Sequence, residues 1–221
     1  MEAGMFYIGI IEDEIAEASS AMLSLTENSD QIEEQSFKLY PMMKKENFKE
    51  ELFEKITEDI KNNRIQGLIV DYKLEKMDEV LEGIEVVNFV HELVPEFPVI
   101  ILTNVPDDSK KNDKADPDKV YAKNVFLNNE KKETRDMVYN IVRNLERYVK
   151  KRVELETRRE QLLNCVVDNA QENETYGELL ETEKELNKYT PIGMTEIDNT
   201  YKVDDMKEAL ELLKEYKGLL E

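Results

Sequence analysis

The chain has 221 residues, of which 40% are hydrophobic and 36% are charged, and its formal net charge is −20. This acidic balance argues against nucleic-acid binding, because phosphate contacts require Lys and Arg. No apolar run approaches the roughly 20 residues of a membrane-spanning helix, and no basic flank precedes an apolar signal core, so we expect a cytoplasmic protein that does not bind membranes. One cysteine, Cys165, excludes an intramolecular disulfide framework, and one histidine, His91, argues against a histidine-rich metal site.

The first expected strand, residues 7–11, ends in Glu12 and Asp13 and leads into an expected helix over residues 15–27. Acidic residues in the first turn of a helix complement its dipole, which accounts for Glu17. The dipole accounts less well for Glu12 and Asp13, because these two residues fall at the end of the strand.

The next two elements are an expected edge strand and a helix. Residues 37–43 have the composition of a short strand, and Pro41 favours a place at the sheet edge because proline cannot donate a ladder hydrogen bond. Residues 46–63 carry apolar side chains at helical spacing and predict a second helix.

The most informative run is Gly67–Asp71, which is continuously apolar until it ends in a carboxylate. Such a run, with no polar alternation, is typical of a strand buried on both faces of a parallel sheet. Residues 72–79 predict a polar loop, after which Gly83 opens a third helix that ends before Pro95. We interpret His91, on this helix, as an ordinary surface or boundary residue.

Two further strands are expected, and each ends in a polar residue. Residues 97–103 end in Thr103, and the run Val120–Ala122 is followed by Lys123. Between them, residues 104–117 have almost no apolar periodicity, so we expect a fourth helix that is short, frayed or absent.

Four strand ends therefore place Glu12, Asp13, Asp71, Thr103 and Lys123 at one edge of the expected sheet, where open α/β sheets bind their ligands. Clustered carboxylates favour a hard divalent cation such as Mg²⁺. A carboxylate oxygen can act as a nucleophile, while a Lys and a Thr can stabilise incoming phosphoryl oxygens. This chemistry suits phosphoryl transfer to Asp71.

These residues, in this order on expected strand ends, resemble the receiver domain of two-component response regulators, and Gly83 opens the following helix as a family glycine does. The resemblance covers about residues 5–128. It implies an α/β fold with a doubly wound, five-stranded parallel sheet of flavodoxin-like order 2-1-3-4-5, in a domain of residues 1–128. Val120 stands at the family's aromatic switch position, and Tyr121 should point to the other side of the strand.

The resemblance also implies a role for each residue. Asp71 would accept a phosphoryl group from a sensor histidine kinase or phosphotransfer protein, and self-phosphorylation and dephosphorylation would be the only catalysis. The metal ion, Mg²⁺ or Mn²⁺, would be bound by Asp13, by Glu12 through water, by Asp71 and by the backbone carbonyl of Lys73. Thr103 and Lys123 would contact the phosphoryl oxygens.

Two alternatives stand beside this interpretation. A phosphatase of the haloacid-dehalogenase type also uses a strand-end Asp, but it has a second Asp two residues later, where this chain has Lys73, and its nucleophile follows the first strand. A pseudo-receiver would keep the fold as a docking or scaffold module and leave phosphorylation unused. The complete set of strand-end residues argues against that second alternative.

Residues 129–221 predict a helical extension with a long helix over about residues 130–170 and shorter helices over 176–189 and 203–220. Leu145 and Leu162 belong to an apolar stripe at alternating spacings of three and four, with Arg152 and Arg159 at seam positions. Such a helix either forms a coiled coil with a second copy or a partner, or folds back against the later helices. We expect the signal to leave through this helix by protein pairing.

Residues 131–159 carry twice as many basic as acidic side chains, whereas residues 1–128 have the reverse ratio. The simpler interpretation of the basic stretch is that it pairs with acidic surfaces of the same chain. Nucleic-acid binding is the less favoured one.

Overall fold

The computed structural model describes residues 5–41, 47–74, 81–104, 120–128, 131–168 and 173–191, all within one compact unit of residues 1–191. Its five main strands are all parallel, in the order β2-β1-β3-β6-β7. Numbered along the chain within this sheet, the order is 2-1-3-4-5, so the predicted doubly wound sheet is confirmed. The strands are β1 (Ile8–Ile11), β2 (Phe37–Leu39), β3 (Gly67–Asp71), β6 (Val99–Thr103) and β7 (Val120–Ala122).

Helices cover both faces of this sheet. Alternate residues of β3 belong to opposite faces: Leu68 and Val70 pack with two helices on one side, and Ile69 packs with two others. Burial on both faces explains why the strand sequence is continuously apolar. The first pair of helices is α2 (Phe48–Lys61) and α3 (Gly83–Leu93), and the second pair is α1 (Ile15–Glu27) and α6 (Lys132–Asp168).

The first half of α6 is part of the sheet's core. Leu145 is fully buried, and a Cβ atom on Gly67 would lie only 2.5 Å from its Cδ2 atom, so helix and strand are in direct contact. Residues on both sides of position 128 therefore share one core. The division of the chain into domains 1–128 and 129–221 stays a prediction.

Several short elements differ from the sequence expectations. The predicted loop over residues 72–79 is wrong at its start, because β4 (Lys73–Leu74) pairs antiparallel with β5 (Leu81–Glu82). The side chains of Leu74 and Leu81 are buried, which anchors this small ribbon. β2 ends at Leu39, and the chain also forms η1 (Glu34–Ser36) and α5 (Lys123–Phe126). Residues 105–117, where we expected a fourth helix that is short, frayed or absent, lie outside the described residues.

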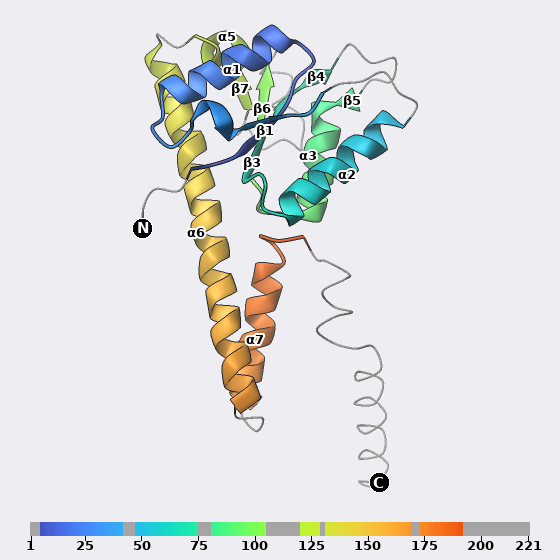
Figure 1. Cartoon of the computed structure of the whole chain (residues 1–221), viewed down its shortest axis with the longest axis vertical. Helices are drawn as coiled ribbons and strands as arrows, with labels where there is room; N and C mark the ends of the chain where they lie inside the picture. The colour runs from blue at the N-terminus through green and yellow to red at the C-terminus, as the bar shows by residue number, and fades with distance from the viewer. Residues whose placement is uncertain are drawn as a thin grey trace. The chain divides into compact units, whose positions relative to one another are not determined.

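The long helix is confirmed as α6, and α7 (Asn173–Leu186) runs back alongside it (Figure 1). Leu155 and Leu162 of α6 and Leu179 and Leu186 of α7 are buried. The helix expected over residues 203–220 lies outside the described residues.

Three arginines of α6 contact other parts of the same chain. Arg159 Nε lies 2.5 Å from Glu183 Oε1 of α7, and Arg158 forms an ion pair with Glu178 of the same helix. Arg152 donates to Asn63 Oδ1 (3.0 Å) in the loop before β3. Two of these three arginines pair with acidic residues of α7, which agrees with the simpler interpretation of the basic stretch for this part of the helix.

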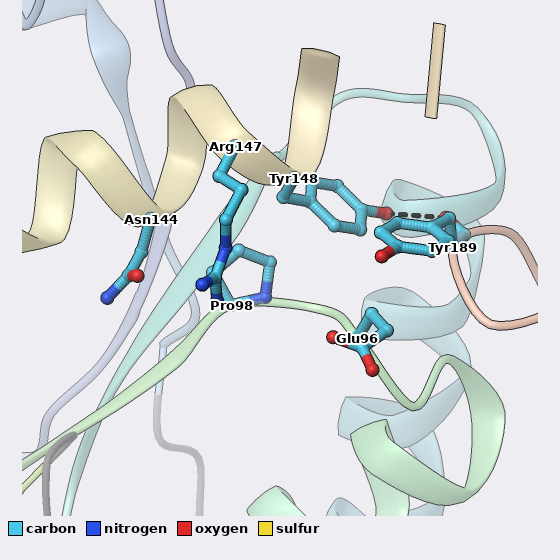
Figure 2. Close-up of a pocket in the computed structure, with 6 residues that line it drawn as sticks. All are labelled: Glu96, Pro98, Asn144, Arg147, Tyr148 and Tyr189. Atoms are coloured by element: carbon cyan, nitrogen blue, oxygen red, sulfur yellow. Dashed lines mark hydrogen bonds between the residues drawn. The ribbon is translucent and has the colours of Figure 1, made fainter. Parts of the chain in front are cut away.

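The residues after α7 contact the loop that enters β6 and also α6, and Figure 2 shows the contact between Tyr189 and Tyr148 of α6. The backbone N–H of Glu96 donates to the carbonyl oxygen of Lys188 (2.9 Å), and the hydroxyl of Tyr148 donates to the carbonyl oxygen of Tyr189 (2.7 Å). The cavity beside these contacts measures about 30 Å³, which is room for about one water and too little for a metabolite. It is lined by Glu96, Pro98, Asn144, Arg147, Tyr148 and Tyr189.

Leu145 requires a correction to the predicted pairing seam. Its side chain is enclosed between α6 and the sheet, so it is not available to a second chain. The apolar residues of α6, at alternating spacings of three and four, pack first against the sheet and then, further along the helix, against α7.

Among the described helices, none is both long enough and apolar enough to cross a membrane.

Candidate functional site

The register of the parallel strands brings the predicted residues to one edge of the sheet. Ile11 is level with Val70, and Asp71 is level with Leu102, so Glu12 follows its strand beside Asp71. On the other side, Thr103 is level with Ala122, the residue before Lys123. The predicted strand ends therefore adjoin along the sheet.

Three carboxylates form a cluster at this edge. One carboxylate oxygen from each of Glu12, Asp13 and Asp71 lies within 4.8 Å of the others. Hard divalent cations take several oxygen ligands, and carboxylates that repel one another gain most from such an ion. The donor chemistry of this cluster thus fits the expected Mg²⁺ or Mn²⁺.

Lys123 lies at the centre of a second set of contacts and is 3% exposed. Its Nζ atom lies 2.8 Å from Oε2 of Glu12 and 3.0 Å from Oδ2 of Asp71. It also donates a hydrogen bond to Oε2 of Glu17, in the first turn of α1. Through one ammonium group, the three contacts link the first residue of α5 to α1, to β3 and to the residue after β1.

Burial and charge shift the ionisation of these groups. Burial raises the pKa of Glu12 to about 7, against the opposing hydrogen bonds from Lys123 and the backbone N–H of Glu14. Burial likewise raises the pKa of Asp71, although Lys123 and the N–H of Lys73 oppose the shift. For Lys123, burial lowers the pKa, but the hydrogen bonds from the ammonium to its three carboxylates outweigh burial and raise it overall. The ammonium is therefore held in its charged form.

The backbone after β3 fixes the position of Asp71. The N–H of Tyr72 donates to the carbonyl oxygen of Leu102 (2.9 Å), and the N–H of Lys73 donates to Oδ1 of Asp71 (3.3 Å). The N–H of Gly83, the first residue of α3, donates to the carbonyl oxygen of Tyr72 (2.9 Å). A Cβ atom on Gly83 would overlap the carbonyl oxygen of Asp71, so only glycine fits between the helix and the strand end.

Thr103 and Lys73 also lie at this edge of the sheet, and their predicted roles concern the phosphoryl oxygens and the metal ion. Thr103 is buried at the end of β6, and its expected contact with phosphoryl oxygens stays a prediction. Lys73 contacts Asp71 through its backbone N–H, and the metal-binding role of its carbonyl also stays a prediction.

His91, as expected, has a local structural contact: its Nε2 lies 3.2 Å from the carbonyl oxygen of Phe97.

Glu17 is the site residue that the sequence reasoning missed. The helix dipole explained its presence in the first turn of α1, but the structure adds a direct contact with Lys123. The sequence offered only its position as a signal: Glu17 lies in the first turn of the helix that directly follows Glu12 and Asp13.

Comparisons of this chain with protein-family models, with curated proteins and with solved structures found no match. The residues at the strand ends and their chemistry are therefore the basis for assigning a function.

Proposed function

We propose that this protein is a response-regulator-like signalling protein that accepts a phosphoryl group on Asp71. The observation that carries the proposal is the placement of one carboxylate between an acidic cluster and a buried ammonium, at the carboxyl end of a central strand. The phosphoryl donor would be a sensor histidine kinase or a phosphotransfer protein.

The proposed reaction is an in-line displacement. A carboxylate oxygen of Asp71 attacks phosphorus, the bond from phosphorus to the donor breaks, and the leaving group departs with the electron pair. Glu12, Asp13 and Asp71 would hold Mg²⁺, which when bound neutralises charge on the phosphoryl oxygens. Lys123 and Thr103 would donate to the same oxygens and lower the barrier by stabilising the developing charge.

A route from this site to the helical region supports a signalling role. Lys123 is the first residue of α5, and the hydroxyl of Ser24 on α1 donates to the carbonyl oxygen of Phe126 at the end of α5 (2.8 Å). The hydroxyl of Thr134 on α6 contacts the carbonyl oxygens of Val125 (2.8 Å) and Asn128 (2.7 Å). A displacement of Lys123 would thus reach α1 and α6 through directly bonded neighbours, and α6 would pass the signal to a protein partner.

Intact-mass analysis after treatment with acetyl phosphate and Mg²⁺ tests the proposal. The wild-type protein should gain about 80 Da, the mass of one phosphoryl group, and Asp71→Asn should gain nothing. A wild-type protein that stays unmodified with small donors and with a histidine kinase alike would favour the phosphorylation-independent docking module.

A further inference from the structure

The ammonium of Lys123 has all of its hydrogen-bond donors engaged. A lysine ammonium has three N–H groups, and Lys123 contacts three carboxylates: Glu12, Asp71 and Glu17. A phosphoryl oxygen can therefore receive a hydrogen bond from Lys123 only if one of these carboxylates gives up its place.

Exposure and additional contacts indicate which carboxylate leaves most easily. The side chains of Glu12 and Asp71 are 5% and 8% exposed, whereas that of Glu17 is 34% exposed. Separating an ion pair costs least where water can hydrate the freed charge. Glu12 and Asp71 are also held by the backbone N–H groups of Glu14 and Lys73. Glu17 is thus the partner that Lys123 can exchange at the lowest free energy.

We propose that Glu17 is a positioning residue that holds Lys123 in the unphosphorylated protein and competes with the phosphoryl group for it. The inference rests on the proposed function of Asp71. In the step, the Asp71 oxygen forms a bond to phosphorus, and the donor's leaving group departs with its electron pair. One N–H group of Lys123 stops donating to Glu17 and donates to a phosphoryl oxygen instead. No net proton transfer is needed, and the Glu17 carboxylate returns to water.

This competition predicts the effect of neutralising Glu17. Glu17→Gln keeps the size of the side chain but replaces a charge-assisted hydrogen bond with a weaker neutral one. Because the contact is partly exposed, its loss should increase the rate of phosphorylation by acetyl phosphate about two- to fivefold. The same change should slow dephosphorylation, since Glu17 no longer competes for Lys123.

The experiment measures phosphorylation by intact mass in full-length wild type, Glu17→Gln and Glu27→Gln, with Mg²⁺ and acetyl phosphate at low and high salt. Glu27 is the matched control, because it lies at the opposite end of α1 and its change removes the same charge from the same helix. Faster labelling of Glu17→Gln alone, persisting at high salt, is the expected result, since salt screens long-range fields much more than a partly buried contact. Glu17→Ala should act in the same direction, and thermal unfolding verifies that each variant is folded.

The remaining outcomes distinguish a failure of the role of Glu17 from a failure of the proposed function of Asp71. Labelling of wild type with an unchanged rate in both Glu17 variants would overturn the role of Glu17 and leave Asp71 as the phosphoacceptor. Equal acceleration in Glu17→Gln and Glu27→Gln, or an acceleration that high salt abolishes, would show a general charge effect and overturn the positioning role. No labelling of any protein would overturn the proposed function and this inference together.

Discussion

Asp13 belongs to a carboxylate cluster whose members repel one another, so a bound divalent cation should relieve this repulsion. Millimolar Mg²⁺ should raise the thermal midpoint of wild type, because an ion that binds only the folded state stabilises it. Asp13→Ala should lose this response, and Asp30→Ala, which removes an exposed carboxylate after α1, should retain it. Differential scanning calorimetry with and without Mg²⁺ measures both. Equal responses in wild type and Asp13→Ala would place the ion elsewhere.

The ionisation of Glu12 should make the stability of the protein depend on pH when divalent cations are absent. Its pKa is about 7 in the folded protein and 4.5 ordinarily, so between these values the folded state binds more protons than the unfolded state. The contribution of Glu12 to the free energy of unfolding therefore falls as pH rises through this window, by on the order of 3 kcal/mol. The raised pKa of Asp71 acts in the same direction.

Urea unfolding in EDTA at several pH values from about 5 to about 8 measures this dependence. Glu12→Gln, which cannot ionise, should flatten the decline in stability that wild type shows. Indistinguishable pH profiles for the two proteins would contradict the burial-driven shift in the pKa of Glu12.

At the scale of elements, the close approach of α3 to β3 makes Gly83 irreplaceable. Gly83→Ala places a Cβ atom on the carbonyl oxygen of Asp71, so the helix must shift; we expect a loss of at least about 2 kcal/mol in stability and a weaker Mg²⁺ response. Gly177→Ala is the matched control, because no atom lies within 4 Å of the added Cβ in α7. That variant should gain about 0.5–1 kcal/mol from its higher helix propensity. Equal effects of the two changes in urea unfolding would contradict this packing.

The strands and their polar ends could be predicted from the sequence because each buried parallel strand is a continuous apolar run that stops abruptly. The small β4–β5 ribbon could not, since two residue pairs leave no periodic pattern. The Glu17 contact with Lys123 depends on how closely α1 approaches the start of α5, which the position of Glu17 in the sequence does not determine. The apolar stripe of α6 correctly predicted that these side chains are buried. It did not predict what covers them, because a sheet, a returning helix or a second chain can pack against the same stripe.

At the scale of the whole molecule, self-association or partner binding through α6 stays a prediction, and the structure restricts the residues that it can use. With Leu145 and Leu162 buried, pairing must involve exposed apolar side chains of the helix pair, such as Val153, Tyr139 and Leu180. Sedimentation at high micromolar concentration should show a dimer for wild type that Val153→Glu shifts toward monomer. A monomeric wild type would remove the dimer and leave binding to a different protein.

Asp71, among several neighbouring carboxylates, is the residue that we propose carries the phosphoryl group. Borohydride reduction converts an aspartyl phosphate to homoserine, so peptide mapping after treatment with acetyl phosphate, Mg²⁺ and borohydride identifies the modified residue directly. We predict conversion at Asp71 alone, and none when the donor or Mg²⁺ is omitted. Conversion at Glu12 or Asp13, or no conversion at any carboxylate, would contradict the assignment of Asp71 as the phosphoacceptor.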